Sequence, residues 1–237
     1  MKFASLLAAA VLAASTPVLA ADLGPAPAEP VAPIYLPFSW TGFYVGAQAG
    51  YSWFDGKQTF PPFDPSTFYS NLRPNTFTLG GQAGYRYQFN GGVVVGVEGD
   101  IYSYFDQNVK EPIAGAAPNG AELTVKFGGS AKAQLGYAFD RFLPYVTGGV
   151  AFIDYSGGSA VIVGGPIFPG TAYSETKVGW TVGAGLAYAF TDHWVGNVEY
   201  RYSDYGSSNF ATPFAFAGTT KLKLTENAIK LGISYKF

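Results

Sequence analysis

Apolar and polar residues alternate along most of the chain after residue 40. In residues 229–237, Ile229, Leu231 and Ile233 fall on one face of an extended strand, and Lys230 and Gly232 fall on the other. The same period of two recurs in seven earlier stretches. The eight predicted strands are residues 41–53, 75–89, 93–105, 123–139, 143–154, 178–190, 194–203 and 229–237. The pattern predicts an all-β protein.

Short and long connections alternate between these strands. Short turns are predicted at residues 90–92, 140–142 and 191–193, and the other four connections are long loops. Both ends of the strand region fall on the side of the short turns. Bacterial transmembrane barrels combine short periplasmic turns with longer extracellular loops. We therefore predict an eight-stranded antiparallel up-and-down transmembrane β-barrel over residues 39–237.

The apolar face of this barrel is predicted to point outward, into lipid. A soluble lipocalin-like barrel would have the reverse arrangement. The opposite face carries mostly Gly, Thr, Ser and Gln, with fewer charged residues than a water-exposed surface usually has. Outward aromatics gather near strand ends, as interfacial girdles require. The predicted periplasmic girdle is Tyr85, Tyr87, Phe89, Tyr137, Phe139, Tyr188, Phe190, Trp194 and Phe237, and the outer one is Tyr51, Trp53, Phe77, Phe105, Trp180 and Tyr202.

The alternation also assigns a facing to the fourth and fifth predicted strands. In the fourth strand the alternation predicts Val125 outward and Lys126 inward. The fifth strand has a Thr-Gly-Gly centre that weakens the signal, and Val146, Val150 and Phe152 outward is the better choice.

The N-terminus has the features of a secretory signal. Lys2 precedes an apolar run over residues 3–12, and Val18-Leu19-Ala20 supplies small residues for cleavage before Ala21. The run is too short to anchor the chain in a bilayer. Residues 1–20 are thus a predicted signal peptide for the Sec pathway. The Pro- and Ala-rich residues 21–38 are interpreted as an extended periplasmic tail, with a partner-binding PxxP segment as the alternative.

Composition narrows the class and the compartment. The chain has 31 Gly, 17 Tyr and 20 Phe, but only 13% charged residues. It contains no Cys, so neither disulfides nor a lipoprotein anchor are expected. An exported apolar chain without a membrane-helix pattern can span a membrane as a closed barrel. We therefore predict the bacterial outer membrane as its location.

The same composition argues against several activities. Removing residues 1–20 leaves thirteen basic and sixteen acidic residues, which gives no reason to expect nucleic acid as a partner. The single histidine, His193, falls in a predicted periplasmic turn. A Ser-His type pair or an imidazole metal site is therefore not expected. We predict no catalytic residues, no metal site, no cofactor and no enzyme activity.

Several charged residues are predicted inside the barrel at similar depth. An eight-stranded barrel is narrow enough for its own side chains to fill it. Buried charges are tolerated when they are paired and hydrogen-bonded. The hypothesis is an internal ion-pair plug, with inner-face glycines leaving room for long side chains, and the alternative is contact with trapped water. The plug residues are Arg86, Glu98, Asp100, Lys132, Glu199, Arg201 and Lys230.

Three of the long loops are unusually apolar, at residues 59–69, 160–168 and 210–216. Exposed apolar patches often contact another surface. The alternative is that these residues pack on one another above the membrane. The sequence leaves both interpretations open.

Several stretches carry a resemblance to a known family. They are Phe38-Ser39-Trp40-Thr41-Gly42-Phe43-Tyr44-Val45-Gly46, Pro144-Tyr145-Val146-Thr147-Gly148-Gly149-Val150-Ala151, Val198-Glu199-Tyr200-Arg201-Tyr202 and Lys230-Leu231-Gly232-Ile233-Ser234-Tyr235-Lys236-Phe237. With the start Ala21-Asp22-Leu23, they resemble the alphaproteobacterial outer-membrane β-barrel family of immunogenic, porin-family surface antigens. The resemblance covers essentially the whole chain after the signal, and implies an OmpA-like eight-stranded barrel.

The resemblance also implies a role. Members are surface proteins with roles in envelope integrity and host contact, and we expect a structural, surface-exposed protein with a closed interior. The alternative is a narrow porin-like channel, or a loop-based binder of a small apolar ligand. Expected partners are outer-membrane lipid and lipopolysaccharide, and host or self contacts through extracellular loops. The closing strand resembles an insertion signal for the barrel-assembly machinery, carried by Ile233, Tyr235 and Phe237.

Overall fold

The computed structural model describes residues 37–59, 69–73, 75–105, 109–112, 120–162, 167–169, 173–211 and 219–237. The predicted signal peptide (1–20), the tail up to residue 36 and the central parts of the three apolar loops lie outside the described residues. The elements are all strands: β1 Gly42–Thr59, β2 Tyr69–Leu72, β3 Asn75–Gln88, β4 Val93–Phe105, β5 Val109–Pro112, β6 Gly120–Tyr137, β7 Phe142–Ile162, β8 Ile167–Pro169, β9 Tyr173–Ala189, β10 Trp194–Ala211 and β11 Thr219–Lys236.

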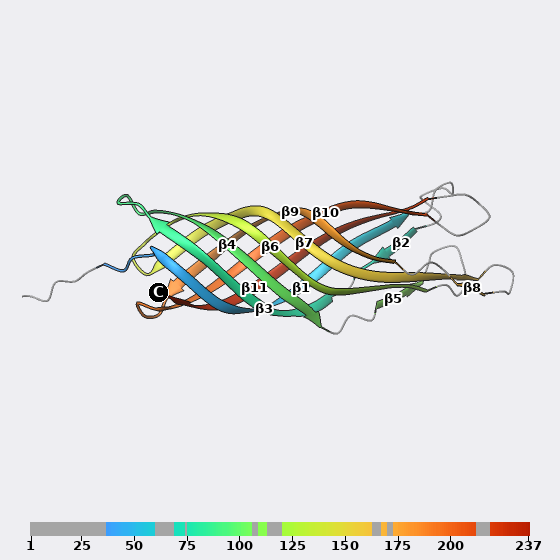
Figure 1. The fold of residues 1–237 in the computed structure, drawn as a ribbon, viewed down its shortest axis with the longest axis horizontal. Coiled ribbons are helices and arrows are strands. Elements are labelled where there is room, and N and C mark those ends of the chain that lie inside the picture. The colour runs from blue at the N-terminus through green and yellow to red at the C-terminus, as the bar shows by residue number, and fades with distance from the viewer. Residues whose placement is uncertain are drawn as a thin grey trace, which may run out of the picture. The chain divides into compact units, whose positions relative to one another are not determined.

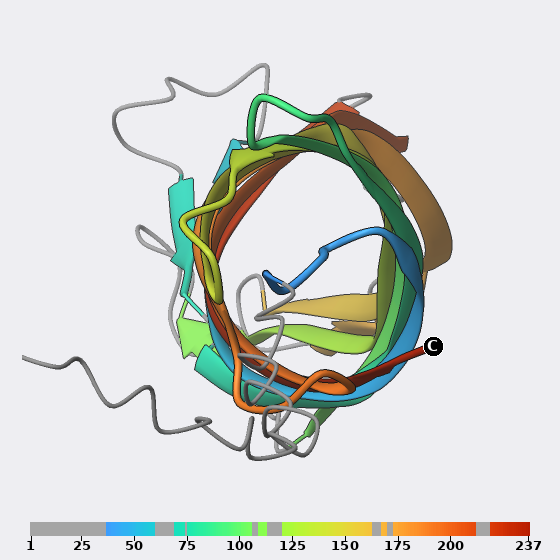
Figure 2. The ribbon, with the colours of Figure 1, turned by 90° about the vertical axis from the view of Figure 1, so that its left-hand side faces the viewer.

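Eight long strands close into an antiparallel ring. The order around the ring is β1, β3, β4, β6, β7, β9, β10 and β11. The seam joins the first strand to the last, in a register that runs from Tyr44 opposite Lys236 to Thr59 opposite Lys221. Figures 1 and 2 show this ring from the side and along its axis. The predicted eight-stranded up-and-down barrel is confirmed.

The remaining strands, β2, β5 and β8, are three or four residues long and pair with the ends of β1, β6 and β7. None of the described residues forms a helix long and apolar enough to span a membrane.

The long strands continue well past the length that a bilayer requires. They run from 13 to 21 residues, whereas a tilted strand crosses the hydrocarbon core with about 9–11. The sequence analysis ended two of the strands at residues 154 and 203 and began the strands after them at residues 178 and 229. These bounds were wrong: β7 runs to Ile162, β9 begins at Tyr173, β10 ends at Ala211 and β11 begins at Thr219. Gly and Ser hide the alternation at the ends of β7 and β10, but backbone ladders need no apolar side chains to form.

Side-chain facing follows the predicted alternation in most of the barrel. Val146 and Val150 of β7 are exposed on the outer wall, and Phe152 lies half-buried on the same side, which confirms the facing of the fifth predicted strand. The prediction for Val125 and Lys126 was wrong, because Val125 is buried inside and Lys126 is exposed outside. The cause is a β-bulge between Val125 and Phe127 in the β6–β7 register, since one extra residue reverses the alternation.

The outer wall presents large apolar side chains to its surroundings. Aromatic pairs stand at the short-turn end, with ring centroids 4.9 Å apart for Tyr87 and Phe89 and 5.4 Å apart for Tyr188 and Phe190. Toward the other end, Tyr51 and Phe77 form a pair at 5.1 Å. A soluble monomer rarely exposes an apolar surface of this extent, so lipid is its natural solvent.

Candidate functional site in the barrel interior

Lys132 of β6 is surrounded by carboxylates. Its Nζ lies 2.9 Å from Glu98 Oε1 and 2.9 Å from Glu199 Oε1. Asp100 Oδ2 lies 3.4 Å away, and the Lys132 side chain is 0% exposed. Glu98 faces Lys132 directly in the β4–β6 register, whereas Glu199 reaches it from β10, which is not a neighbour of β6. The contact with Glu199 therefore crosses the lumen.

Arg201 of β10 is the second cation of this cluster. Its Nη2 lies 2.8 Å from Asp100 Oδ2, and its Nη1 donates to Oδ1 of the same carboxylate at 3.3 Å. Its Nε donates to Glu199 Oε1 at 3.0 Å. Ser130 Oγ adds a hydrogen bond to Asp100 at 3.0 Å. Buried ions are tolerated when their remaining lone pairs and protons are also satisfied, and this cluster meets that condition.

Arg86 joins the interior without an ion pair among the described residues. Its Nε donates to Gln134 Oε1 at 2.7 Å, and its guanidinium lies over the rings of Tyr44, at 4.3 Å, and Trp40, at 5.6 Å. Tyr44 in turn donates its hydroxyl to Glu98 at 2.6 Å. An added Cβ at inward-facing Gly84 would lie 2.5 Å from that hydroxyl oxygen, so this glycine leaves room for Tyr44.

Lys230 of β11 is the fourth predicted interior cation, and it is held differently. Its Nζ has no hydrogen-bond partner among the described residues. It lies instead 3.0 Å from the ring centroid of Tyr102. The predicted plug residues are therefore all buried, but the ion pairs join only five of the seven: Glu98, Asp100, Lys132, Glu199 and Arg201.

Glu226 of β11 is an interior charge that the sequence analysis missed. Its carboxylate accepts hydrogen bonds from Ser52 at 2.7 Å, Tyr205 at 2.7 Å and Tyr104 at 3.1 Å. Extending the alternation backwards from Lys230 through even-numbered residues would have found it. With Glu226, the buried residues of the described chain contain four cations and four carboxylates.

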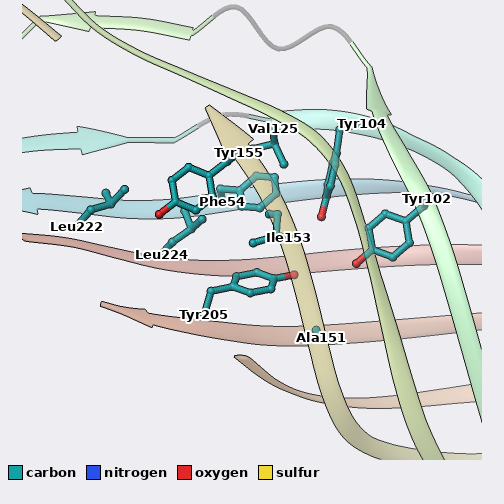
Figure 3. Packing of buried hydrophobic residues seen from close by; sticks show 10 residues of the cluster. All are labelled: Phe54, Tyr102, Tyr104, Val125, Ala151, Ile153, Tyr155, Tyr205, Leu222 and Leu224. Atoms are coloured by element: carbon teal, nitrogen blue, oxygen red, sulfur yellow. The ribbon is translucent and has the colours of Figure 1, made fainter. Parts of the chain in front are cut away.

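A layer of aromatic and aliphatic side chains fills the barrel on the long-loop side of these charges. Ten buried residues from six strands point toward one another (Figure 3). They are Phe54, Tyr102, Tyr104, Val125, Ala151, Ile153, Tyr155, Tyr205, Leu222 and Leu224. We call this set the outer cluster. Its residues Tyr104 and Tyr205 contact Glu226, and Tyr102 contacts Lys230, so the cluster combines apolar packing with polar contacts.

A second apolar cluster closes the short-turn end. The chain just before β1 turns into the lumen, as Figure 2 shows. Trp40 is 1% exposed, its Nε1 donates to Asp140 O at 2.9 Å, and its backbone N donates to Gln88 Oε1 at 2.8 Å. Phe38 packs edge-on against it at 5.1 Å. Phe38 had been placed in the predicted tail, but its side chain belongs to the barrel mouth.

We call this second set the mouth cluster: Phe38, Trp40, Val94, Leu143, Tyr145, Ala187, Ala189 and Val195. Asp140 helps to position it from the turn before β7, where its backbone has a positive φ of 53°, a conformation that Asp tolerates better than most residues.

The other predicted features occupy the rim and the seam. His193 Nδ1 lies 3.0 Å from Lys236 O, and its ring stacks on Tyr235 at 5.3 Å, so its contacts are those of a turn residue. Phe237 donates its backbone N–H to Phe43 O at 2.9 Å, and its side chain is 70% exposed on the outer wall, beside Tyr235.

A model of the outer membrane protein beta-barrel domain matches residues 6–237. The chain belongs to this outer-membrane β-barrel family. It is 35% identical over 245 residues to the 25 kDa outer-membrane immunogenic protein of Brucella abortus biovar 1, covering 100% of this chain and 99% of that protein. It is 31% identical over 208 residues to the 22 kDa outer membrane protein of Rhizobium leguminosarum bv. viciae, covering 87% and 82%.

Among solved structures, the outer membrane protein OprG from Pseudomonas aeruginosa aligns with a TM-score of 0.54 at 11% identity, over 83% of this chain and 96% of that one. That similarity shows the fold alone. The resemblance stated from the sequence and the predicted outer-membrane location are confirmed. The relatives are named as outer-membrane proteins and immunogenic proteins rather than as enzymes.

Proposed function

We propose that this outer-membrane barrel is a structural and surface-contact protein whose interior is closed to solutes. The observation that carries the proposal is Lys132, fully buried and in contact with three carboxylates. An ion moving through the lumen would have to separate these charges in a medium of low dielectric constant. The mouth cluster and the outer cluster add an apolar barrier on either side of them.

The surface-contact role is supported by the length of the strands. β7 has 21 residues, about twice what the hydrocarbon core requires, so the wall continues beyond the membrane on the long-loop side. In this role the long connections meet host surfaces or other copies of the chain. The closing strand serves insertion, with Phe237, Ile233 and half-buried Tyr235 on the outer wall available to the barrel-assembly machinery. No catalytic role is proposed for any interior residue.

A narrow channel is the second candidate, and one observation favours it. Four buried polar atoms lack a hydrogen-bond partner among the described residues: Gln48 Nε2, Tyr102 Oη, Thr147 Oγ1 and Lys230 Nζ. Buried polar groups normally have a partner, which can be water. A file of water touching these atoms would be the start of a conducting path.

Conductance in planar bilayers separates the two candidates. The wild-type protein, shown to be folded by its heat-modified gel mobility, is expected to give no conductance. The double variant Glu98→Ala, Lys132→Ala removes the central cation and one of its carboxylates, and is expected to conduct. The matched control removes an aromatic pair from the outer wall, Phe43→Ala with Tyr85→Ala, and is expected to stay closed. Stable conductance of the wild type would refute the closed interior and support the channel.

A further inference from the structure

Three lysines gather on the outer wall where β1 meets β11. Lys57 and Lys223 are direct partners in the register of these strands, and Lys221 lies two residues along β11 on the same face. Buried Leu222 and Leu224 alternate with them, which fixes the lysines outward. Like charges directly opposite each other destabilise a sheet, so this pairing calls for an anion between them. We call these three residues the lysine cluster.

Nearby acids neutralise only part of this charge. Asp204 Oδ2 lies 3.8 Å from Lys223 Nζ. Asp55 pairs with Arg73 instead of with a lysine, because its Oδ1 lies 3.7 Å from Arg73 Nε. Lys57 and Lys221 have no ion-pair partner within the part of the chain that the structure describes. Two exposed ammonium groups therefore remain available to a ligand from outside.

The depth of the lysine cluster matches the lipid headgroups. Trp53, part of the outer aromatic girdle, lies four residues before Lys57 on β1, which corresponds to roughly 10 Å along the membrane normal for a tilted strand. The cluster is at the long-loop end, which faces the cell exterior in barrels of this class. The outer leaflet of an outer membrane carries phosphorylated glycolipid, whose phosphates lie at this level.

We propose that Lys57, Lys221 and Lys223 form a binding surface for the phosphate groups of outer-leaflet glycolipid, the lipid A part of lipopolysaccharide. The ammonium groups contact phosphate oxygens, and the apolar wall below Trp53 contacts the acyl chains. The proposal is independent of whether the interior conducts, because it concerns only the outer face of the β1–β11 seam.

The test measures thermal stabilisation of the refolded barrel in detergent micelles, read as the temperature at which the heat-modified gel band converts. Bisphosphorylated lipid A is expected to raise this temperature, and dephosphorylated lipid A is not. In the double variant Lys57→Gln, Lys221→Gln, the half-saturating concentration should rise about thirtyfold, since each lysine near an anionic surface contributes about a fivefold step. Lys223 is retained, so Asp204 keeps its partner.

Two further proteins make the result decisive. Lys126→Gln removes an exposed lysine of β6 that lies outside the cluster, and should bind lipid A like the wild type. The double variant Lys57→Arg, Lys221→Arg keeps both charges and should also bind. An unchanged response of the Gln double variant would overturn the proposal. So would equal stabilisation by dephosphorylated lipid A, or an equal shift with inorganic phosphate alone. Conductance of the same proteins reports separately on the interior.

Discussion

The charges around Lys132 and the charges at the outer cluster are equally buried but are stabilised in different ways. Around Lys132, cations and carboxylates meet directly, with N–O distances of 2.8 to 3.4 Å. At the outer cluster, Glu226 accepts hydrogen bonds from uncharged hydroxyls, and Lys230 lies over the ring of Tyr102. One region balances charge with charge, and the other disperses it over polar and aromatic groups.

This difference sets how each region responds to substitution. Removing one member of a direct ion pair leaves the other charge buried and unpaired, which is strongly destabilising. Removing a charge that has no charged partner leaves no such orphan. Equal burial therefore does not mean equal sensitivity, and the contrast can be tested with substitutions of the same kind in the two regions.

The largest effect is expected from Lys132→Met. It leaves Glu98 and Glu199 without their shared cation, at a cost of about 3–5 kcal/mol in the free energy of unfolding. Urea unfolding in detergent micelles, followed by gel mobility, measures this cost. Lys126→Met is the matched control, because it changes an exposed lysine on the same strand and should cost nothing. Equal stability of the two variants would contradict the contrast.

An intermediate effect is expected from Glu226→Gln. The amide keeps one acceptor but loses the charge-assisted character of the bonds from Ser52, Tyr104 and Tyr205, so the cost should be about 1–3 kcal/mol. The same unfolding assay applies. Ser52→Ala removes only one of the donors and serves as the comparison. If Glu226→Gln cost as much as Lys132→Met, a carboxylate that is held by hydroxyl groups would be as sensitive to substitution as a direct ion pair, which would contradict the contrast.

The smallest effect is expected from Lys230→Met. The variant loses a cation–aromatic contact but also removes an ammonium group without a hydrogen-bond partner. The thioether can pack on the same ring, so the net loss should be below about 1 kcal/mol. A loss of several kcal/mol would show that Lys230 has the same dependence on charge as Lys132, and would remove the distinction between the regions. The two lysine variants are best measured side by side.

The sequence predicts which side chains face outward from the barrel better than it predicts the contacts of the side chains inside. Strand facing follows from a period of two, which is local, so residues such as Val146 and Leu231 were placed correctly. The bulge after Val125 was not predicted, because a one-residue insertion into a strand does not change its composition. The burial of Trp40 was not predicted, because it depends on contacts with Gln88 and Asp140, which are distant in sequence.

The interior shows the same limit. Alternation correctly places Lys132 and Lys230 on one face, but it says nothing about partners across the lumen. The side chains of Lys132 and Glu199 meet in the lumen although β6 and β10 are not neighbours, whereas Lys230 contacts the ring of Tyr102. Such pairings depend on the shear of the closed barrel and on side-chain length, which no local pattern records.

The contacts across the lumen also have a mechanical meaning. A ring held only by ladder hydrogen bonds resists stretching around its circumference but can flatten without breaking a single rung. Arg201 of β10 binds Asp100 of β4, four strands away in either direction, so this pair spans a diameter. Flattening that lengthens this diameter would pull these paired charges apart inside the buried interior. Ion pairs across the lumen therefore make the barrel resist deformation of its cross-section by the lateral pressure of the membrane.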